Sequence, residues 1–139
     1  MNREEINSEI KKMLGIVPTM FNSIPDNTLE EEWSLFKKMQ LTEGLIPLKY
    51  QELMGLAISS VSKCKYCVHF HTEVAKLFGA TNEEIETAIH FSKQTAGWSA
   101  YINGLALDFD DFKDEMKQIT TYVRKAMANE EKRKEERYA

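Results

Sequence analysis

Two cysteines and a histidine lie close together in the chain, at a spacing that suits thiol chemistry. Cys64 and Cys67 are the two cysteines of the 139-residue sequence, and they form a C-x-x-C motif. If the segment is helical, Cys64, Cys67 and His71 occupy positions i, i+3 and i+7 and share one face. Free backbone N–H groups and the positive end of the dipole at a helix start favour a thiolate. The spacing therefore predicts an activated dithiol that can close a disulfide.

Two further residues could handle the proton of such a thiol. His71 follows Cys67 by one helical turn, and an imidazole at that position can accept the thiol proton. Glu52 is expected on the preceding helix, where its carboxylate could orient the imidazole. Periodicity alone does not bring Glu52 to the cysteines, so this arrangement depends on how the two helices pack.

Two simpler interpretations of the cysteine pair compete with catalysis. A structural zinc site would use Cys64, Cys67 and either His69 or His71, but such sites need four ligands. The chain has no second cysteine pair, and His90 is expected on another helix as a packing or surface residue. We therefore expect no metal. The second interpretation is a pair of buried cysteines without chemistry, because free cysteines are often buried.

The elements that must position these residues are all expected to be helices. The apolar residues recur at helical spacing, and no run alternates with period two for long enough to indicate a sheet. This counts against a thioredoxin fold, which places C-x-x-C in a βαβ context. The expected helices cover about 2–14, 27–40, 47–62, 66–78, 81–92, 98–107 and 108–127.

Local signals set several of these boundaries. Asn2 with Glu5, and Thr81 with Glu84, form capping-box patterns. Gly97 is expected to interrupt a helix. The segment 15–25 is too apolar for a free linker, so we expect it to pack on the core.

Length and charge limit the domain organisation and the partners. The chain is long enough for one domain, predicted over 1–128, with a charged C-terminal tail or helix end at 129–139. The net charge of −4 and the absence of a basic stripe argue against nucleic-acid binding. No window is apolar enough for a membrane span, and the charged start does not look like a secretory signal. We expect a cytoplasmic protein.

At this point a family resemblance becomes visible. Glu52, Cys64, Cys67 and His71 together resemble the E-x11-C-x2-C-x3-H motif of the alkylhydroperoxidase AhpD-like branch of the carboxymuconolactone decarboxylase family. Residues 14–18 resemble the family's G-x-V-P entry, and residues 79–85 resemble its G-A-[ST]-x-E-E-I segment. The likeness covers about residues 12–107. It implies an all-α, AhpD-like helical domain of about six to eight helices that forms homotrimers or homohexamers. It also implies an active site at the buried end of the cysteine helix.

The resemblance implies a role for each residue of the motif. Cys67 would be the peroxidatic cysteine, which becomes a sulfenic acid, and Cys64 would resolve it as a disulfide. His71 and Glu52 would form the proton relay. The peroxidase pattern has a second histidine just before the peroxidatic cysteine, whereas this chain has Tyr66 there. A tyrosine can hydrogen-bond but does not buffer protons near neutral pH. His69 is a candidate substitute, although it lies one residue off the shared face.

The expected function is that of a thiol-dependent peroxidase without a bound cofactor. Its substrate would be a small hydroperoxide, and its reductant a dithiol such as a lipoyl protein or a thioredoxin-like protein. One alternative is a carboxymuconolactone decarboxylase-like lyase, although that branch works without the cysteine pair. Another is a non-catalytic, redox-sensing helical oligomer. The apolar segments 17–24 and 97–107 are expected to contribute to subunit contacts.

Overall fold

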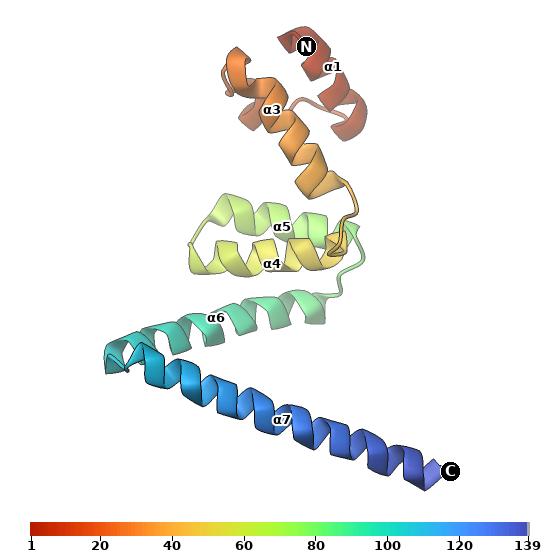
Figure 1. The fold of residues 1–139 in the computed structure, drawn as a ribbon. Coiled ribbons are helices and arrows are strands. Elements are labelled where there is room, and N and C mark those ends of the chain that lie inside the picture. Colours follow the sequence, from red (N-terminus) through yellow and green to blue (C-terminus); the bar gives the residue numbers. More distant parts are fainter. Residues whose placement is uncertain (139) are drawn as a thin grey trace. The chain divides into compact units, whose positions relative to one another are not determined.

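In the computed structural model, which describes residues 1–138, all regular secondary structure is helical (Figure 1). The predicted all-α class is therefore confirmed, and seven α-helices within the described part agree with the predicted six to eight. The elements are α1 (Arg3–Leu14), α2 (Thr19–Asn22), α3 (Asp26–Phe36), the π-helix η1 (Lys37–Leu41), α4 (Leu48–Val61), α5 (Lys65–Leu77), α6 (Asn82–Leu105) and α7 (Phe109–Tyr138).

The chain divides into two compact units, Met1–Gln94 and a second unit from Thr95 onward. The first unit contains α1 to α5 and the first part of α6, including every residue of the predicted site. The second contains the end of α6 and all of α7. The prediction of one domain over 1–128 with a charged segment at 129–139 stays a prediction.

The N-terminal helix begins where its capping box predicts and ends at Leu14, the predicted last residue. The Asn2 side chain accepts a hydrogen bond from the Glu5 backbone, and the Glu5 side chain accepts one from the Asn2 backbone. This capping box satisfies two N–H groups that the first turn leaves free. Gly15 ends the helix in the left-handed region, with φ of 81°, where a side chain would be strained.

One hydrophobic cluster of the first unit is built from α1, α2 and α3. Ile6 and Ile10 of α1 are buried against Phe21, Leu29 and Trp33. Phe21 meets Trp33 edge to face, with ring centroids 5.3 Å apart. Because Phe21 lies in α2, the segment 15–25 packs on the core as predicted.

One turn of π-helix follows α3, which the sequence did not predict. The expected α-helix over 27–40 instead changes to η1 at Lys37. Thr42 Oγ1 donates a hydrogen bond to the Lys37 carbonyl at 3.0 Å, so a side chain helps to satisfy the backbone at this wider turn. The π-turn follows Phe36, whose ring also lines the cavity beside the cysteines.

The two helices that carry the predicted site, α4 and α5, pack side by side as an antiparallel hairpin (Figure 1). Pro47 caps α4, where its missing N–H costs nothing. The connection contains Lys63 in the left-handed region, with φ of 58°. The Cys64 backbone N–H donates to the Ser59 carbonyl at 3.1 Å, which holds the start of α5 against the end of α4.

The α6 helix begins where predicted, but it lacks the interruption predicted at Gly97. Thr81 and Glu84 form the expected capping box, with hydrogen bonds of 2.9 and 3.1 Å. The prediction that Gly97 breaks the helix is wrong, because α6 is continuous from Asn82 to Leu105. A glycine inside a helix costs only about 1 kcal/mol relative to alanine, which the surrounding helix-forming residues overcome. Lys49 Nζ contacts Glu84 Oε1 at 2.8 Å and so links α4 to α6.

In the second unit, α7 is a single helix of 30 residues. The charged segment from 129 continues it as a helix to Tyr138, and residues 129–137 are exposed. Across the described part of the chain, no helix is both long and apolar enough to cross a membrane.

Candidate active site

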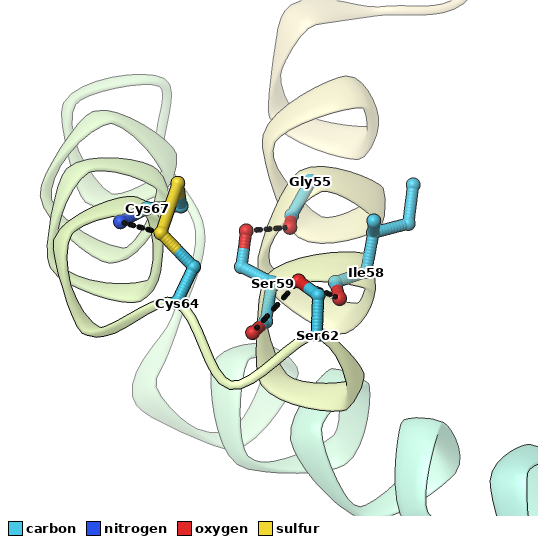
Figure 2. Close-up of a disulfide and its surroundings, with 6 residues drawn as sticks. All are labelled: Gly55, Ile58, Ser59, Ser62, Cys64 and Cys67. Carbon is cyan, nitrogen blue, oxygen red and sulfur yellow. Dashed lines mark hydrogen bonds between the residues drawn. A yellow bond between two sulfur atoms is a disulfide. The ribbon is translucent and has the colours of Figure 1, made fainter.

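The two cysteines meet at the start of α5, where they form a disulfide (Figure 2). Cys64 is the N-cap residue of α5, and Cys67 lies in its first turn. Their Cα atoms are 5.3 Å apart, and the Cys67 backbone N–H donates to Cys64 Sγ at 3.3 Å. Cys64 Sγ therefore caps the helix by accepting this hydrogen bond, as a serine or aspartate oxygen commonly does at the N-cap. The disulfide is the oxidised form of the pair. After reduction, the free N–H groups and the dipole at the helix start favour a thiolate at this position.

Glu52 and His71 are brought together by the packing of α4 against α5. His71 Nδ1 lies 2.7 Å from Glu52 Oε2. The Glu52 side chain is fully buried, whereas that of His71 is 17% exposed. Because a carboxylate accepts hydrogen bonds, the neutral imidazole that fits this contact carries its proton on Nδ1, which leaves the lone pair of Nε2 free. This leaves His71 as a base whose orientation is held by a second residue.

The Glu52 carboxylate is unusual because one of its two oxygens has no hydrogen-bond partner among residues 1–138. Its Oε1 atom is buried and accepts no hydrogen bond from the described residues. Removing a carboxylate from water is costly unless its charge is compensated. His71 is the single hydrogen-bond donor that the described residues supply to this side chain.

A small apolar cavity lies beside Cys67. Its volume is about 210 Å³, and it is lined by Met20, Phe36, Tyr66, Cys67, Phe70 and His71. The Phe70 ring meets the His71 imidazole edge to face, with centroids 5.1 Å apart. Cys67 and His71 thus line the same pocket, whose walls are mostly apolar, as in many small-molecule sites.

The auxiliary residues differ in their placement. Tyr66 lines the cavity, although its side chain is 77% exposed. His69 is exposed and does not line the cavity, and His90 is exposed on α6. Cys67 is also exposed, so this single chain leaves the site more open than the resemblance implies. Within the part of the chain described, no group of three or more metal-ligating side chains comes together.

Several residues of the site were missed by sequence reasoning. Met20 and Phe36 reach the cavity from α2 and α3, and no local pattern connects them with Cys67. Gly55, inside α4, carried a usable signal, since an isolated glycine in a helical pattern often has a packing reason. A methyl group at Gly55 would lie within 2.6 Å of His71 Nδ1.

Comparisons with known proteins agree with this geometry. Residues 28–108 match the carboxymuconolactone decarboxylase family. A Paracoccus denitrificans protein described as "uncharacterized protein 4 in cox locus" is 26% identical over 74 residues, which cover 53% of this chain and 67% of that protein. The crystal structure of an alkylhydroperoxidase AhpD core from Rhodospirillum rubrum superposes with a TM-score of 0.67 and 22% identity. That match covers 78% of this chain and 82% of the other, and it shows a shared AhpD-like fold.

Proposed function

Because the chain belongs to the carboxymuconolactone decarboxylase family, we propose that its cysteine pair makes it a thiol-dependent peroxidase of the alkylhydroperoxidase type. One observation carries this proposal. The buried Glu52–His71 pair lies one helical turn from Cys67, which already shares a disulfide with Cys64. A purely structural cysteine pair needs no oriented base beside it, whereas an activated thiol does.

In the first step, Cys67 reacts with a small hydroperoxide. His71 Nε2 takes the thiol proton, and the Cys67 thiolate attacks the terminal oxygen of the peroxide. The O–O bond breaks as the S–O bond forms, so sulfur is oxidised and the peroxide is reduced. The departing alkoxide takes the proton from His71. The products are a Cys67 sulfenic acid and an alcohol.

In the second step, Cys64 resolves the sulfenic acid. Its sulfur attacks that of Cys67, the S–O bond breaks, and the hydroxide takes the Cys64 proton and leaves as water. The 5.3 Å between the two Cα atoms suits this disulfide without backbone movement. A separate dithiol, such as a lipoyl or thioredoxin-like protein, then supplies two electrons and two protons to restore both thiols.

Tyr66 has a supporting role in this proposal. Its ring lines the cavity beside Cys67, at the position where the related peroxidases carry a histidine. A phenol can donate a hydrogen bond to the peroxide but does not exchange protons near neutral pH. Because His69 lies outside the cavity, proton transfer runs through His71.

We also propose that the protein forms a homotrimer or homohexamer, as the resemblance implies. Large apolar side chains are exposed at helical spacing along one side of α7, and contiguous apolar surface of this kind usually marks an interface. The α7 residues concerned are Phe109, Met116, Ile119, Val123 and Met127. The predicted contact segment 97–107 also exposes Trp98, Tyr101 and Leu105 in the same unit.

The function is tested by counting thiols on the reduced protein before and after one equivalent of tert-butyl hydroperoxide. We expect two thiols to be lost, to return with dithiothreitol, and to be consumed again in repeated cycles. Cys67→Ser should abolish peroxide consumption, whereas Cys64→Ser should accumulate a sulfenic acid that a dimedone probe traps. The double variant Cys64→Ser/Cys67→Ser is the matched control.

Three outcomes would contradict the proposal in different ways. Thiols that stay unmodified would exclude peroxide chemistry and favour a lyase or a structural pair. A single oxidation without turnover would indicate a redox sensor. Identical behaviour of the two single variants would refute the assignment of roles to Cys64 and Cys67.

A further inference from the structure

Gly55 lies in the interior of α4, where glycine is an unfavourable choice for a helix. A Cβ atom built there would lie 2.6 Å from Nδ1 and 2.7 Å from Nε2 of the His71 ring, closer than real Cβ contacts come. Gly97 and Gly104, both inside α6, would meet nothing within 4 Å. The imidazole therefore occupies the space that a side chain at position 55 would need. Among the described residues, nothing occupies the corresponding space at Gly97 or Gly104.

We infer that Gly55 is a positioning residue, whose missing side chain lets the His71 ring reach Glu52. The functional consequence rests on the proposed role of His71 as the base for Cys67. The contact itself does not depend on that role, so the two can be tested separately.

The backbone of α4 is held in place at this point, so the ring has to yield to a larger side chain. Ser59 is buried, and its Oγ donates to the Gly55 carbonyl at 2.6 Å (Figure 2). The Ser59 carbonyl in turn accepts from the Cys64 backbone, which ties this part of α4 to the start of α5. The His71 side chain is 17% exposed and can turn towards solvent.

Turning the ring away would break the hydrogen bond between His71 and Glu52. Glu52 and Gly55 are three residues apart on α4, so their side-chain positions lie on the same face of the helix. Both positions lie next to the His71 imidazole. A methyl group at position 55 would displace Nδ1 from its 2.7 Å contact with Glu52 Oε2. Both carboxylate oxygens would then be buried without a donor, since Oε1 already lacks one among the described residues.

The first test is a double-mutant cycle on thermal stability, using Gly55→Ala and His71→Ala in the full chain. Gly55→Ala should lower the melting temperature by several degrees in the wild-type background. With His71→Ala the ring is gone, so the same methyl group should leave the melting temperature unchanged or raise it.

The second test measures alkylation of Cys67 by iodoacetamide as a function of pH, in a Cys64→Ser background that leaves one thiol. Gly55→Ala should move the pH midpoint upward, in the same direction as His71→Ala, and slow the reaction near neutral pH about tenfold, as expected for losing one charge-assisted hydrogen bond. A glycine needed only for helix packing would change stability without moving this midpoint.

The outcomes separate this inference from the proposed function. Additive effects in the cycle together with an unchanged alkylation profile would overturn the role of Gly55, even in an active peroxidase. Non-additive effects in a protein that does not react with hydroperoxide would support the contact and overturn the proposed function. If Gly55→Ala alone does not fold, folding of the double variant with His71→Ala would support the contact. Failure of the double variant to fold where His71→Ala alone folds would refute it.

Discussion

Replacing Glu52 by glutamine removes the charge of the buried carboxylate and keeps the shape of the side chain. Glutamine has nearly the same volume, and its carbonyl oxygen can still accept the hydrogen bond that His71 Nδ1 gives to Glu52 Oε2 at 2.7 Å. The variant therefore keeps the orientation of the ring but removes the negative charge behind it. A negative charge behind the ring stabilises the imidazolium that forms when His71 takes the thiol proton, so Glu52→Gln should weaken His71 as the base for Cys67.

The size of the effect follows from the strength of the bond. A hydrogen bond to a charged group contributes about 1.5–3 kcal/mol, and one between neutral groups about 1 kcal/mol. The difference of about 0.5–2 kcal/mol corresponds to a roughly 2- to 30-fold slower reaction of Cys67. Stability should change little, because two effects oppose each other. The variant removes a fully buried charge, but its amide leaves a buried N–H group unpaired where Oε1 now lacks a partner.

The assay is alkylation of Cys67 by iodoacetamide at pH 7 in the Cys64→Ser background. Serine at position 64 can keep the cap, because its oxygen can accept the bond that Cys67 N–H now gives to sulfur. Urea unfolding of each variant reports stability, with an expected change of about 1 kcal/mol or less. Glu86→Gln, the same substitution at an exposed position on α6, is the matched control.

Two results would refute this reasoning. An unchanged alkylation rate in a folded Glu52→Gln variant would show that the buried charge does not act on the thiol. A rate loss accompanied by large destabilisation would show that Glu52 holds the packing of α4 against α5 rather than tuning His71.

Three further predictions concern the scaffold. Lys63→Gly should raise the free energy of unfolding in urea by roughly 0.5–1 kcal/mol, because its φ of 58° strains any residue with a side chain. The hydrogen bond from Lys49 lowers the pKa of Glu84 below its usual 4.5, so the stability from this pair is present above that pH and is lost as the pH falls through the lowered pKa. As the pH is lowered, the free energy of unfolding of the wild type should therefore approach that of Lys49→Met. A constant difference between the two proteins across this pH range would contradict the linkage. Ile119→Glu on the apolar side of α7 should reduce the assembly mass measured by light scattering, whereas Gln118→Glu should not.

The local features of the fold were readable because they depend on neighbouring residues. Asn2 with Glu5, and Thr81 with Glu84, cap their helices as predicted, since each side chain bonds a backbone group three residues away. The placement of the cysteines at a helix start was equally local. Gly97 was misjudged because the cost of one glycine is small beside the stability of a long helix.

The sequence by itself determined the helical class and the spacing of Cys64, Cys67 and His71, because these follow from the periodicity of a single segment. Only the tertiary structure decided that Glu52, 19 residues before His71, reaches the imidazole. It also decided that Gly55 makes room for the ring and that Met20 approaches Cys67. These contacts depend on the angle and separation at which whole helices pack, and many distant side chains set those quantities together.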